Sequence, residues 1–451
     1  MTVAVLGGGV TGLTAAWRVA SQGHKVRLFE SAPRVGGVVR SEATGGWLAE
    51  AGPISFQEST SEIAGVISEL GLGPERIASS PEAANRYVVR KGRLVAVPAP
   101  SSLGAFLATP LLSMRAKLAI GSEATRSPVN RTEDVSVAEL VRDHFGKDVL
   151  DTLVQPLISG IYAGDAERLS ARHAFPKVWE AERTVGSFVR AAAEASKRRK
   201  DLGLPGTAIV SFRKGLQALT DALASRLPAG TVTTGAQVLG IYRGKTSLWS
   251  VTWDGPKGQE RGEFDFVIAA LPAGSLSTLD VAGARPLAGL SAIEYAPVAS
   301  LTLGFRRDQV AHPLDGFGAL VPASENRTIL GVIFASSLFE GRAPEGHVAL
   351  TVFAGGALRP DIAGLGEAAL TERVCADLAD LLGAKGKPVL ARHTYWKRAI
   401  PQYNLGYGRH LGAIEACEAA HAGLFIGGNV RDGIALPDCI VSGTALAKRV
   451  S

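Results

Sequence analysis

The opening thirty residues constrain the fold of this chain more than any other stretch. Residues Val3 to Leu6 are apolar and partly β-branched, as a buried parallel strand requires. A G-x-G-x-x-G pattern follows at residues 7–12, and a helical stretch runs from Leu13 to Gln22. A second strand, Val26 to Phe29, ends at Glu30, about 20 residues after the glycines. Strand, turn, helix, strand and acid therefore occur in the order of a βαβ nucleotide-binding unit.

Each glycine of this pattern has a physical role. Gly7 allows the tight turn, Gly9 lets the backbone approach a pyrophosphate, and Gly12 lets the helix lie close to the sheet. The helix N-terminus offers free N–H groups and a positive dipole to the phosphates. The carboxylate of Glu30 is placed to bind ribose hydroxyls. The pattern predicts a dinucleotide site, and the alternative is a glycine-rich turn that binds nothing.

Length and composition predict a globular protein of several domains. A chain of 451 residues is too long for one ordinary core, so two or three domains are expected. Hydrophobic residues make up 46% and charged residues 20%, which excludes a disordered chain. The net charge of +6 provides solubility, or attracts anionic lipid or an acidic substrate. No arginine-rich tract with interleaved aromatic residues indicates nucleic acid, so no such partner is expected.

The cysteines and histidines give no indication of disulfide bonds or of a metal site. Cys375, Cys417 and Cys439 form no C-x-x-C pair and no disulfide framework, which predicts buried thiols in a reducing compartment. The eight histidines show no ligand spacing, so no metal site is expected. A strand that begins at residue 3 leaves no room for a signal peptide, and no apolar run reaches the ~20 residues that span a bilayer. We expect a cytoplasmic protein whose contact with the cytoplasmic face of the cell membrane, if present, is peripheral.

The order of the predicted elements indicates discontinuous domains. The buried strand within 264–272 belongs in the first sheet, and a strand running into glycines at 424–429 precedes a last helix. The fold class is therefore α/β with α+β, a Rossmann-like nucleotide domain combined with a mixed-sheet domain and a helical domain. The expected division is nucleotide-binding 1–84, 205–285 and 420–451; substrate-binding 85–98 and 286–419; and helical 99–204.

A second group of glycines favours FAD over NAD as the dinucleotide. Gly36 and Gly37 follow Glu30 and let further backbone N–H groups approach a long cofactor, while Arg34 can face its phosphates. The alternative for Arg34 is a solvated loop cation. The C-terminal strand–glycine–helix unit at 424–449 would bring a second helix N-terminus to the same cofactor.

The segment Glu30 to Gly37 resembles the flavin amine oxidase and protoporphyrinogen oxidase superfamily. More specific motifs resemble protoporphyrinogen oxidases, the penultimate enzymes of haem synthesis, and they occur in order along nearly the whole chain. These motifs are Asn85-Arg86-Tyr87-Val88, Ser159 to Asp165, Leu169-Ser170 with Ala174-Phe175-Pro176, Gly316 to Pro322, and Gly428-Asn429 to Asp438-Cys439.

The resemblance implies a set of FAD contacts. Residues of the glycine loop and of the segment after Glu30 would contact the cofactor, and Val238 would meet the adenine through its backbone. Gly52 to Ser55 would pass near the flavin ring, which Trp396 and Ile434 to Leu436 would line. The implied residues are Gly7, Gly8, Gly9, Val10, Thr11, Gly12, Glu30, Ser31, Arg34, Gly37, Val38, Gly52, Pro53, Ile54, Ser55, Val238, Trp396, Ile434, Ala435 and Leu436.

The resemblance also implies a substrate site. Arg86 would hold a propionate of the substrate, and a surface ion pair is its alternative role. Leu320, Ile333 and Phe353 would form an apolar pocket for the tetrapyrrole, although a plain core uses the same residue types. Ile333 stands where relatives often carry leucine, which keeps the pocket apolar. Gly160 and Gly164 would lie in the loop that closes the cavity.

The implied reaction oxidises protoporphyrinogen IX to protoporphyrin IX. Six electrons leave in three two-electron steps to the flavin, and dioxygen accepts them to give three hydrogen peroxide molecules. The cofactor supplies this chemistry, so no catalytic acid or base is assigned. Glu180 and Glu182 are close in sequence but are expected to be surface or structural residues.

Two alternative functions stay open at this point, as do the contact with a membrane and the oligomeric state. A coproporphyrinogen III oxidase of the same fold would need more cations for its four propionates, and a non-catalytic escort protein would need no flavin. The apolar stretch Leu103 to Leu118, with Arg115 and Lys117 able to meet lipid phosphates, either rests on a membrane or packs in a core. The resemblance also allows a homodimer, and the sequence leaves the oligomeric state open.

Overall fold

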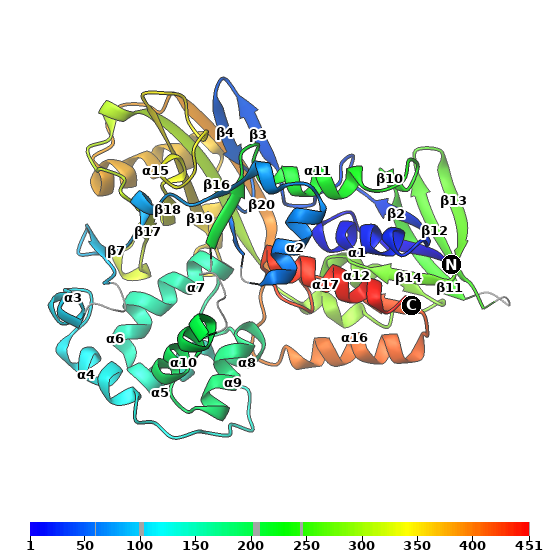
Figure 1. Ribbon diagram of the computed structural model, residues 1–451, viewed down its shortest axis with the longest axis horizontal. Helices are drawn as coiled ribbons and strands as arrows, with labels where there is room; N and C mark the ends of the chain where they lie inside the picture. Colours follow the sequence, from blue (N-terminus) through cyan, green and yellow to red (C-terminus); the bar gives the residue numbers. More distant parts are fainter. Residues whose placement is uncertain (59, 99–102, 202–207, 244–246, 451) are drawn as a thin grey trace.

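The computed structural model describes residues 1–58, 60–98, 103–201, 208–243 and 247–450. In Figure 1, a part built on an open sheet and containing both termini lies on the right, a large sheet at the upper left and a layer of helices at the lower left. The boundaries expected beside residue 99 and between 204 and 205 lie outside the described residues.

The sheet on the right is built around the first strand. Its order is β10-β2-β1-β14-β21, and every neighbouring pair is parallel. The return of β14 to β1 confirms that the buried strand near residue 268 belongs to the first sheet. The bounds are β1 Thr2–Leu6, β2 Lys25–Glu30, β10 Val232–Thr234, β14 Phe266–Ala269 and β21 Leu424–Ile426.

The two faces of this sheet bury different cores. Val3 and Val5 pack with helices α1 (Val10–Ser21) and α17 (Leu436–Lys448), whereas Ala4 and Leu6 face the opposite cluster. Alternation of side chains along a strand makes this division. A Cβ at Gly443 would lie 2.5 Å from the Thr11 carbonyl oxygen, so α1 and α17 are in near backbone contact. They lie side by side in Figure 1.

Smaller elements complete this part of the molecule. The helices are α2 Ser61–Glu69, α11 Gln217–Ser225, α12 Ala273–Thr278 and α16 Gly408–Ala420. A four-stranded sheet has the order β13-β12-β11-β15, with bounds Gly258–Phe264, Trp249–Gly255, Gln237–Arg243 and Asp280–Val281. A hairpin joins β3 Ser41–Thr44 to β4 Trp47–Glu50, and a third sheet joins β5 Phe56–Glu58, β9 Ala208–Phe212 and β6 Arg76–Ala78.

The large sheet at the upper left has seven strands in the order β20-β16-β19-β18-β17-β7-β8. Helix α15 (Glu367–Leu382) covers one face, where Leu301, Val332 and Val352 pack against it. The dipeptide Lys91-Gly92 between two strand-like stretches predicts a hairpin. Strands β7 and β8 form it, and both turn residues have positive φ. The bounds are β7 Asn85–Arg90, β8 Arg93–Ala96, β16 Tyr295–Arg306, β17 Gly316–Leu320, β18 Ile329–Ile333, β19 His347–Gly355 and β20 Leu390–Pro401.

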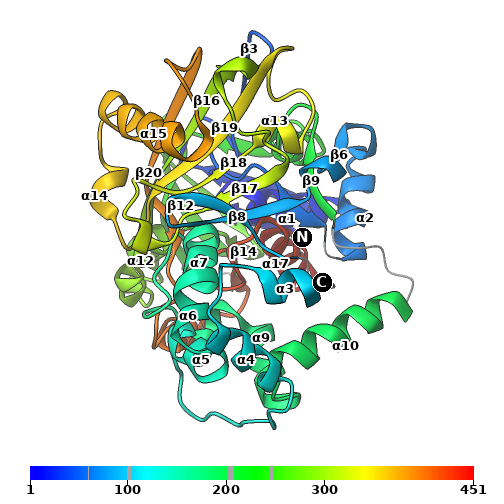
Figure 2. The same cartoon turned by 90° about the vertical axis from the view of Figure 1, so that its left-hand side faces the viewer.

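The helical layer faces the uncovered side of this sheet. Figure 2 shows α7 standing beneath β17 and β18, with the other helices further from the sheet. No described helix has the length and apolar character needed to cross a membrane. The principal bounds are α3 Leu103–Ala108, α4 Met114–Glu123, α5 Val137–Phe145, α7 Gln155–Tyr162, α8 Ala171–Ala174, α9 Pro176–Thr184 and α10 Phe188–Asp201.

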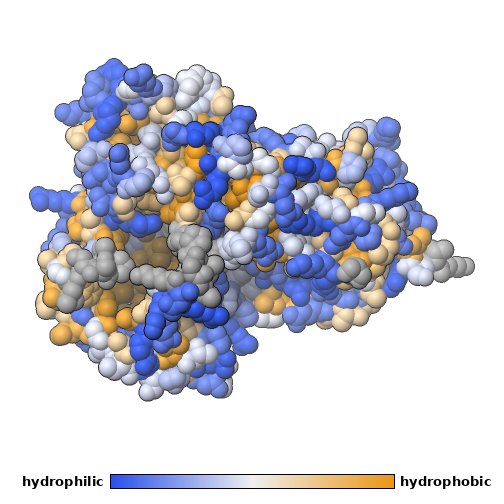
Figure 3. Space-filling view, in the orientation of Figure 1, coloured by the Kyte–Doolittle hydropathy of each residue, from blue (hydrophilic) through white to orange (hydrophobic). Residues whose placement is uncertain are grey.

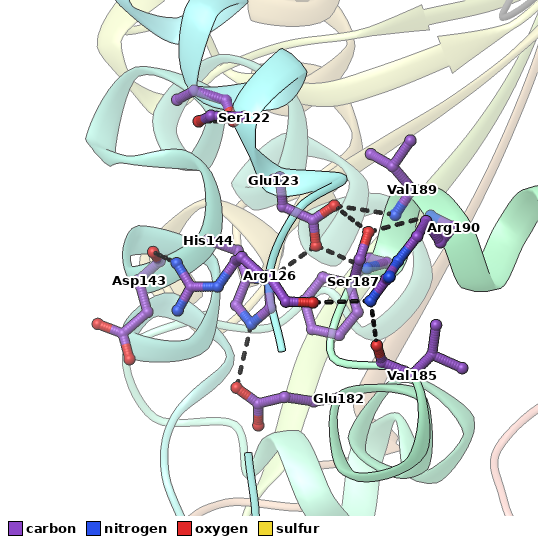
Figure 4. Close-up of polar contacts among 12 residues, drawn as sticks. Ser122, Glu123, Arg126, Asp143, His144, Glu182, Val185, Ser187, Val189 and Arg190 are labelled. Carbon is purple, nitrogen blue, oxygen red and sulfur yellow. Dashed lines mark hydrogen bonds and ion pairs between the residues drawn. The ribbon is translucent and has the colours of Figure 1, made fainter. Parts of the chain in front are cut away.

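A buried polar network joins four of these helices (Figure 4). His144 of α5 lies 2.9 Å from Glu123 of α4 through Nδ1 and 3.0 Å from Glu182 of α9 through Nε2. Both ring nitrogens can donate only when the imidazole carries both protons. Glu123 also accepts from Ser187 Oγ at 2.7 Å and from the Phe188 N–H at 2.6 Å, so it caps the start of α10.

Charge balance explains why buried carboxylates persist here. Arg131 donates to Glu182 at 2.9 Å and also pairs with Asp143. Burial opposes ionisation of Glu123, but the hydrogen bonds from Ser187, His144 and the start of α10 hold its pKa below the usual value. Glu182 is thus structural, as expected, and Glu180 lies at the surface in a pair with Arg183.

Replacing Glu123 should test this network. Glu123→Ala leaves the imidazole and the start of α10 without their shared acceptor, so the free energy of unfolding should fall by about 3–5 kcal/mol. Glu180→Ala, at an exposed ion pair, is the control and should leave the urea midpoint unchanged within error. Equal midpoints for the two variants would contradict a structural role for Glu123.

Candidate functional site

The glycine loop is shaped for a group that lies on its backbone. Gly7 has φ +98°, and a Cβ there would lie 2.4 Å from the Ala270 carbonyl oxygen. A Cβ at Gly12 would lie 1.9 Å from the Gly7 carbonyl oxygen, so the loop and helix need bare backbone. At Gly9, by contrast, a Cβ would meet nothing within 4 Å. The open space at Gly9 fits a pyrophosphate at the N-terminus of α1.

The start of α1 offers its N–H groups without competition. Gly9 is the N-cap, no side chain caps the helix, and no acidic residue lies in its first turn. Val10 and Thr11 begin the helix and are buried. Gly37 lies beside the loop, because a Cβ on it would be 3.4 Å from the Gly9 Cα atom. The structure therefore brings Gly7 to Thr11 and Gly37 together, as expected from the sequence.

Glu30 ties the loop to the end of β2. Its Oε2 accepts from the Gly8 N–H at 2.7 Å and its Oε1 accepts from the Ala32 N–H at 2.8 Å, while Ser31 Oγ lies 3.4 Å away. A carboxylate has about four acceptor positions, so Glu30 retains capacity for ribose hydroxyls. The Ala236 N–H donates to the Glu30 carbonyl at 2.9 Å, which brings Val238 on β11 to the same edge.

Arg34 has a different arrangement from the one expected. Its guanidinium donates to the carbonyls of Val35, Val39 and Gly37 at 2.8–3.2 Å, so it holds its own loop. Val38 is exposed at the tip of this loop. The observed role of Arg34 is thus to shape the segment that carries Gly37 and Val38, and contact with phosphate stays a prediction.

Two distant segments meet beside this loop. A Cβ at Gly52 would lie 2.2 Å from the Val38 carbonyl oxygen, so only glycine permits this approach. The Trp396 indole on β20 donates to the Ala51 carbonyl at 2.7 Å. The rest of the predicted segment, Pro53, Ile54 and Ser55, follows Gly52 into the loop before β5, with Ile54 buried. Gly52 and Trp396, far apart in the chain, therefore both lie beside the loop that carries Val38.

The C-terminal loop approaches from the other side. A Cβ at Gly428 would lie 3.4 Å from Thr11 Oγ1, which places this loop against the start of α1. Ile434 and Ala435 precede α17, which begins at Leu436. The Ala435 N–H donates to the Asp438 side chain at 3.3 Å. A second helix N-terminus thus lies beside the first, as expected.

The uncovered face of the seven-stranded sheet carries the predicted substrate residues. Strand register pairs Gly318 with both Arg86 and Ile333, and pairs Gly331 with both Leu320 and Phe353. Paired residues point to the same face of a sheet, so all four side chains lie on one face with glycines between them. Phe353 is also in register with Ser300 and Thr394, so Trp396 lies on this face too.

Arg86 is the cation at one side of this face. It is exposed, and its guanidinium carbon lies 5.7 Å from the centroid of the Phe317 ring. Ion pairs among the described residues do not include Arg86. Its charge is therefore free to meet an anionic ligand above the sheet.

Helix α7 lies opposite the sheet face. A Cβ at Gly160 would lie 2.9 Å from Leu320 Cδ2, so Gly160 touches the predicted apolar residues. Leu157 and Ile161 on the same helix are exposed at 47% and 43%. Gly164 is buried, and its carbonyl accepts from Gln155 Nε2 at 3.0 Å, so its role is to shape the chain after α7. Figure 3 shows apolar side chains gathered in a hollow between the two left-hand parts.

Sequence reasoning missed a buried carboxyl at the edge of the site. Glu50 ends β4, directly before Ala51 and Gly52, and accepts from the Leu216 N–H at 2.8 Å and from Ser41 Oγ at 2.6 Å. Burial raises the pKa of Glu50 to about 7, although these hydrogen bonds and Arg342 act in the opposite direction. Its partner Leu216 is far away in sequence, so no local pattern indicates its burial.

Comparison with known proteins finds similarity along almost the whole chain. Residues 10–451 match the model of the flavin containing amine oxidoreductase family. Protoporphyrinogen oxidase 2, chloroplastic/mitochondrial, of Arabidopsis thaliana is 32% identical over an alignment of 476 residues. The alignment covers 99% of this chain and 93% of the relative. Coproporphyrinogen III oxidase of Bacillus subtilis is 27% identical over 463 residues, or 98% and 96% of the two chains.

The fold is also that of solved structures. A crystal structure from Exiguobacterium sp. 255-15 superposes with a TM-score of 0.82, and the match covers 100% of this chain and 98% of that one. The identity is 23%, so this likeness establishes the architecture alone: an α/β part with a parallel sheet, combined with mixed-sheet and helical parts.

The buried carboxyl of Glu50 predicts a pH dependence of stability. A raised pKa means that the folded protein holds this proton more tightly than the unfolded chain, so stability falls as pH rises from about 4.5 to about 7. Glu50→Gln removes this effect, and the variant should gain on the order of 3 kcal/mol relative to wild type over that interval. Unfolding by urea at pH values across this range measures it. Parallel pH profiles for the two proteins would contradict the assignment.

Proposed function

The chain belongs to the flavin-containing amine oxidoreductase family, and we propose that within it the protein oxidises protoporphyrinogen IX to protoporphyrin IX. The enzyme is a flavin-dependent oxidoreductase with FAD as its cofactor. Dioxygen is the proposed acceptor, with three hydrogen peroxide molecules formed for each porphyrin.

One observation supports this proposal above all others. The sheet face that carries Arg86 and the apolar side chains of Leu320 and Phe353 also carries Trp396, whose indole bonds to the residue before Gly52. A tetrapyrrole has a broad apolar ring system and anionic propionates at one edge. An apolar floor with one free cation at its side complements that shape and charge.

The residues present fit FAD. The bare backbone at Gly9, the uncapped start of α1 and the spare acceptor positions of Glu30 suit its pyrophosphate and ribose. Gly52, Val38 and Trp396 on one side and Ile434 to Leu436 on the other are the proposed neighbours of the flavin ring. The chemistry that FAD supplies when bound is two-electron acceptance and reoxidation by dioxygen.

The protein's own contribution is position and exclusion of water. Arg86 orients the substrate by a charge-assisted hydrogen bond to a propionate, while Leu320, Ile333 and Phe353 support the ring. Gly160 lets α7 approach Leu320 closely, which keeps the cavity narrow and dry. No residue needs to act as a general acid or base in this scheme.

Coproporphyrinogen III is the second candidate substrate, because a coproporphyrinogen III oxidase is among the relatives. That substrate carries four propionates and needs more cations. In the two register rows that contain Ile333 and Phe353, the cations are Arg86 and Arg392, and Arg392 already lies 3.8 Å from Glu42. Within these two rows of described residues, a single unpaired cation favours the substrate with fewer propionates.

Aerobic assays with both porphyrinogens test the proposal. The purified protein should carry FAD and convert protoporphyrinogen IX to fluorescent porphyrin with a kcat/KM roughly tenfold or more above that for coproporphyrinogen III. Consumption of dioxygen should accompany the fluorescence. The reverse preference would replace the proposal with its alternative, and oxidation of neither would overturn both.

Arg86 should matter for binding more than for turnover. Arg86→Ala removes the partner of the propionate and with it about 1.5–3 kcal/mol of binding free energy. KM for protoporphyrinogen IX should therefore rise roughly 10- to 150-fold, with a smaller change in kcat. Arg93→Ala, near the turn end of the same hairpin, is the matched control. An unchanged KM in the Arg86 variant would end this assignment.

We further propose that the protein contacts membranes through α3 and α4. Leu107, Met114 and Leu118 are exposed at 51%, 62% and 70%, with Arg115 beside them. The expectation that Lys117 also meets lipid is wrong, because its ammonium is buried and donates to the carbonyls of Leu107 and Thr109 at 2.7 and 2.9 Å. Lys117 instead ties α4 to the end of α3. Exposed apolar side chains next to a cation fit an interfacial contact with anionic lipid.

Vesicle flotation tests this contact. Wild type should float with vesicles containing phosphatidylglycerol, and the double variant Met114→Glu, Leu118→Glu should stay in the aqueous fractions, because it places anions at the lipid surface. Val389→Glu, at a site 55% exposed beside β20, is the control and should float like wild type. Failure of wild type to float would refute the contact.

A further inference from the structure

Two tyrosines lie beneath the loop that joins β21 to α17. Tyr403 follows β20 and Tyr407 precedes α16; both side chains are almost completely buried, at 3% and 2% exposure. Their rings stack with centroids 4.3 Å apart at an angle of 28°. Such stacking fixes the direction in which both hydroxyl groups point.

Both hydroxyl groups point at the same loop. The Tyr403 hydroxyl donates to the Asn429 carbonyl at 2.7 Å and accepts from the Gly433 N–H at 3.1 Å. The Tyr407 hydroxyl donates to the Val430 carbonyl at 2.8 Å. Burial raises the pKa of both phenols well above the ordinary value, so both stay protonated donors across the working range of pH.

The opposite side of the loop is held by different groups. Asp432 accepts from the Gly428 N–H at 3.0 Å, and the Ser442 hydroxyl of α17 accepts from the same N–H at 2.9 Å. Hydrogen bonds therefore hold the start of the loop to α17 and residues 429–433 to the two tyrosines. Gly428 and Gly433 both have positive φ, which glycine adopts about as readily as negative φ. These glycines therefore do not fix the loop conformation by themselves.

The tyrosine pair also connects this loop to the helical layer. The Ser170 N–H donates to the Tyr403 carbonyl at 2.8 Å, and the Leu405 N–H donates to the Arg168 carbonyl at 2.8 Å. The segment around Tyr403 is thus fixed to the helical layer through its backbone and to the loop through its side chain. Any shift of Tyr403 would move Gly433 and the residues that follow it.

We propose that Tyr403 and Tyr407 are positioning residues that hold the loop 428–436 in the shape required to seat the flavin ring. This inference rests on the proposed FAD site. Tyr403 has the larger role, because its hydroxyl joins both ends of the turn between Asn429 and Gly433. Loss of that hydroxyl leaves the half-buried Asn429 carbonyl and Gly433 N–H without this partner, which the loop relieves by moving.

Three phenylalanine variants test the proposal. Tyr403→Phe and Tyr407→Phe each remove one hydroxyl from the loop. Tyr162→Phe is the matched control, because the Tyr162 residue is similarly buried and its ring lies beside that of Tyr403, but its hydroxyl donates to the Ala174 carbonyl in the helical layer, at 3.1 Å. For each protein the dissociation constant of FAD, the visible circular dichroism of the flavin, its midpoint potential and the unfolding temperature of the apoprotein are measured.

The expected result separates positioning from plain stability. Tyr403→Phe should raise the dissociation constant of FAD roughly tenfold and alter the flavin dichroism and midpoint potential, with a smaller effect for Tyr407→Phe. Tyr162→Phe should lower the apoprotein unfolding temperature without changing the flavin signals. Wild-type flavin binding and spectra in Tyr403→Phe would overturn the inference, even if that variant is less stable. Failure of wild type to bind FAD would instead overturn the proposed function on which it rests.

Discussion

The close approach of backbone to backbone at the first turn is the constraint on which the structure depends. A Cβ at Gly12 would lie 1.9 Å from the Gly7 carbonyl oxygen, so α1 can follow β1 only with glycine at this place. That turn sets α1 against the parallel sheet and leaves the space at Gly9 open. Gly52 approaches a backbone carbonyl almost as closely, since a Cβ there would lie 2.2 Å from the Val38 oxygen. Gly37 and Gly428 lie beside the first turn in ordinary contact, at 3.4 Å from Gly9 Cα and Thr11 Oγ1. The proposed dinucleotide site is therefore formed mainly by backbone atoms of several segments, with few side chains at its centre.

The shape of the candidate site depends on contacts between elements that are far apart in the chain. The hydrogen bond from Trp396 to the Ala51 carbonyl joins the seven-stranded sheet to the cofactor side, and Gly160 brings α7 onto Leu320. The buried network of Glu123, His144 and Glu182 fixes the helices behind α7. Because breaking such a network leaves buried charge unpaired, these helices hold a defined position opposite the sheet.

Local patterns predicted the parts of the fold that have local causes. The glycine loop, the hairpin at Lys91 and the return of β14 to the first sheet follow from turn chemistry and apolar runs. Strand β20 and helix α16 were missed, since β20 is an edge strand rich in exposed charges and α16 contains two glycines in place of a clear apolar stripe. The burial of Lys117 and Glu50 depends on partners brought by tertiary packing, which sequence periodicity does not contain.

In the proposed reaction, protoporphyrinogen IX bound on the sheet face gives its electrons directly to FAD held by this chain. Anaerobic mixing of the FAD-loaded protein with protoporphyrinogen IX, followed by visible absorbance, measures this transfer without dioxygen. The absorbance of the oxidised flavin should fall at a rate that saturates with substrate, and it should return when dioxygen is admitted. Flavin that stays oxidised with protoporphyrinogen IX, but is bleached by dithionite in the same sample, would contradict it.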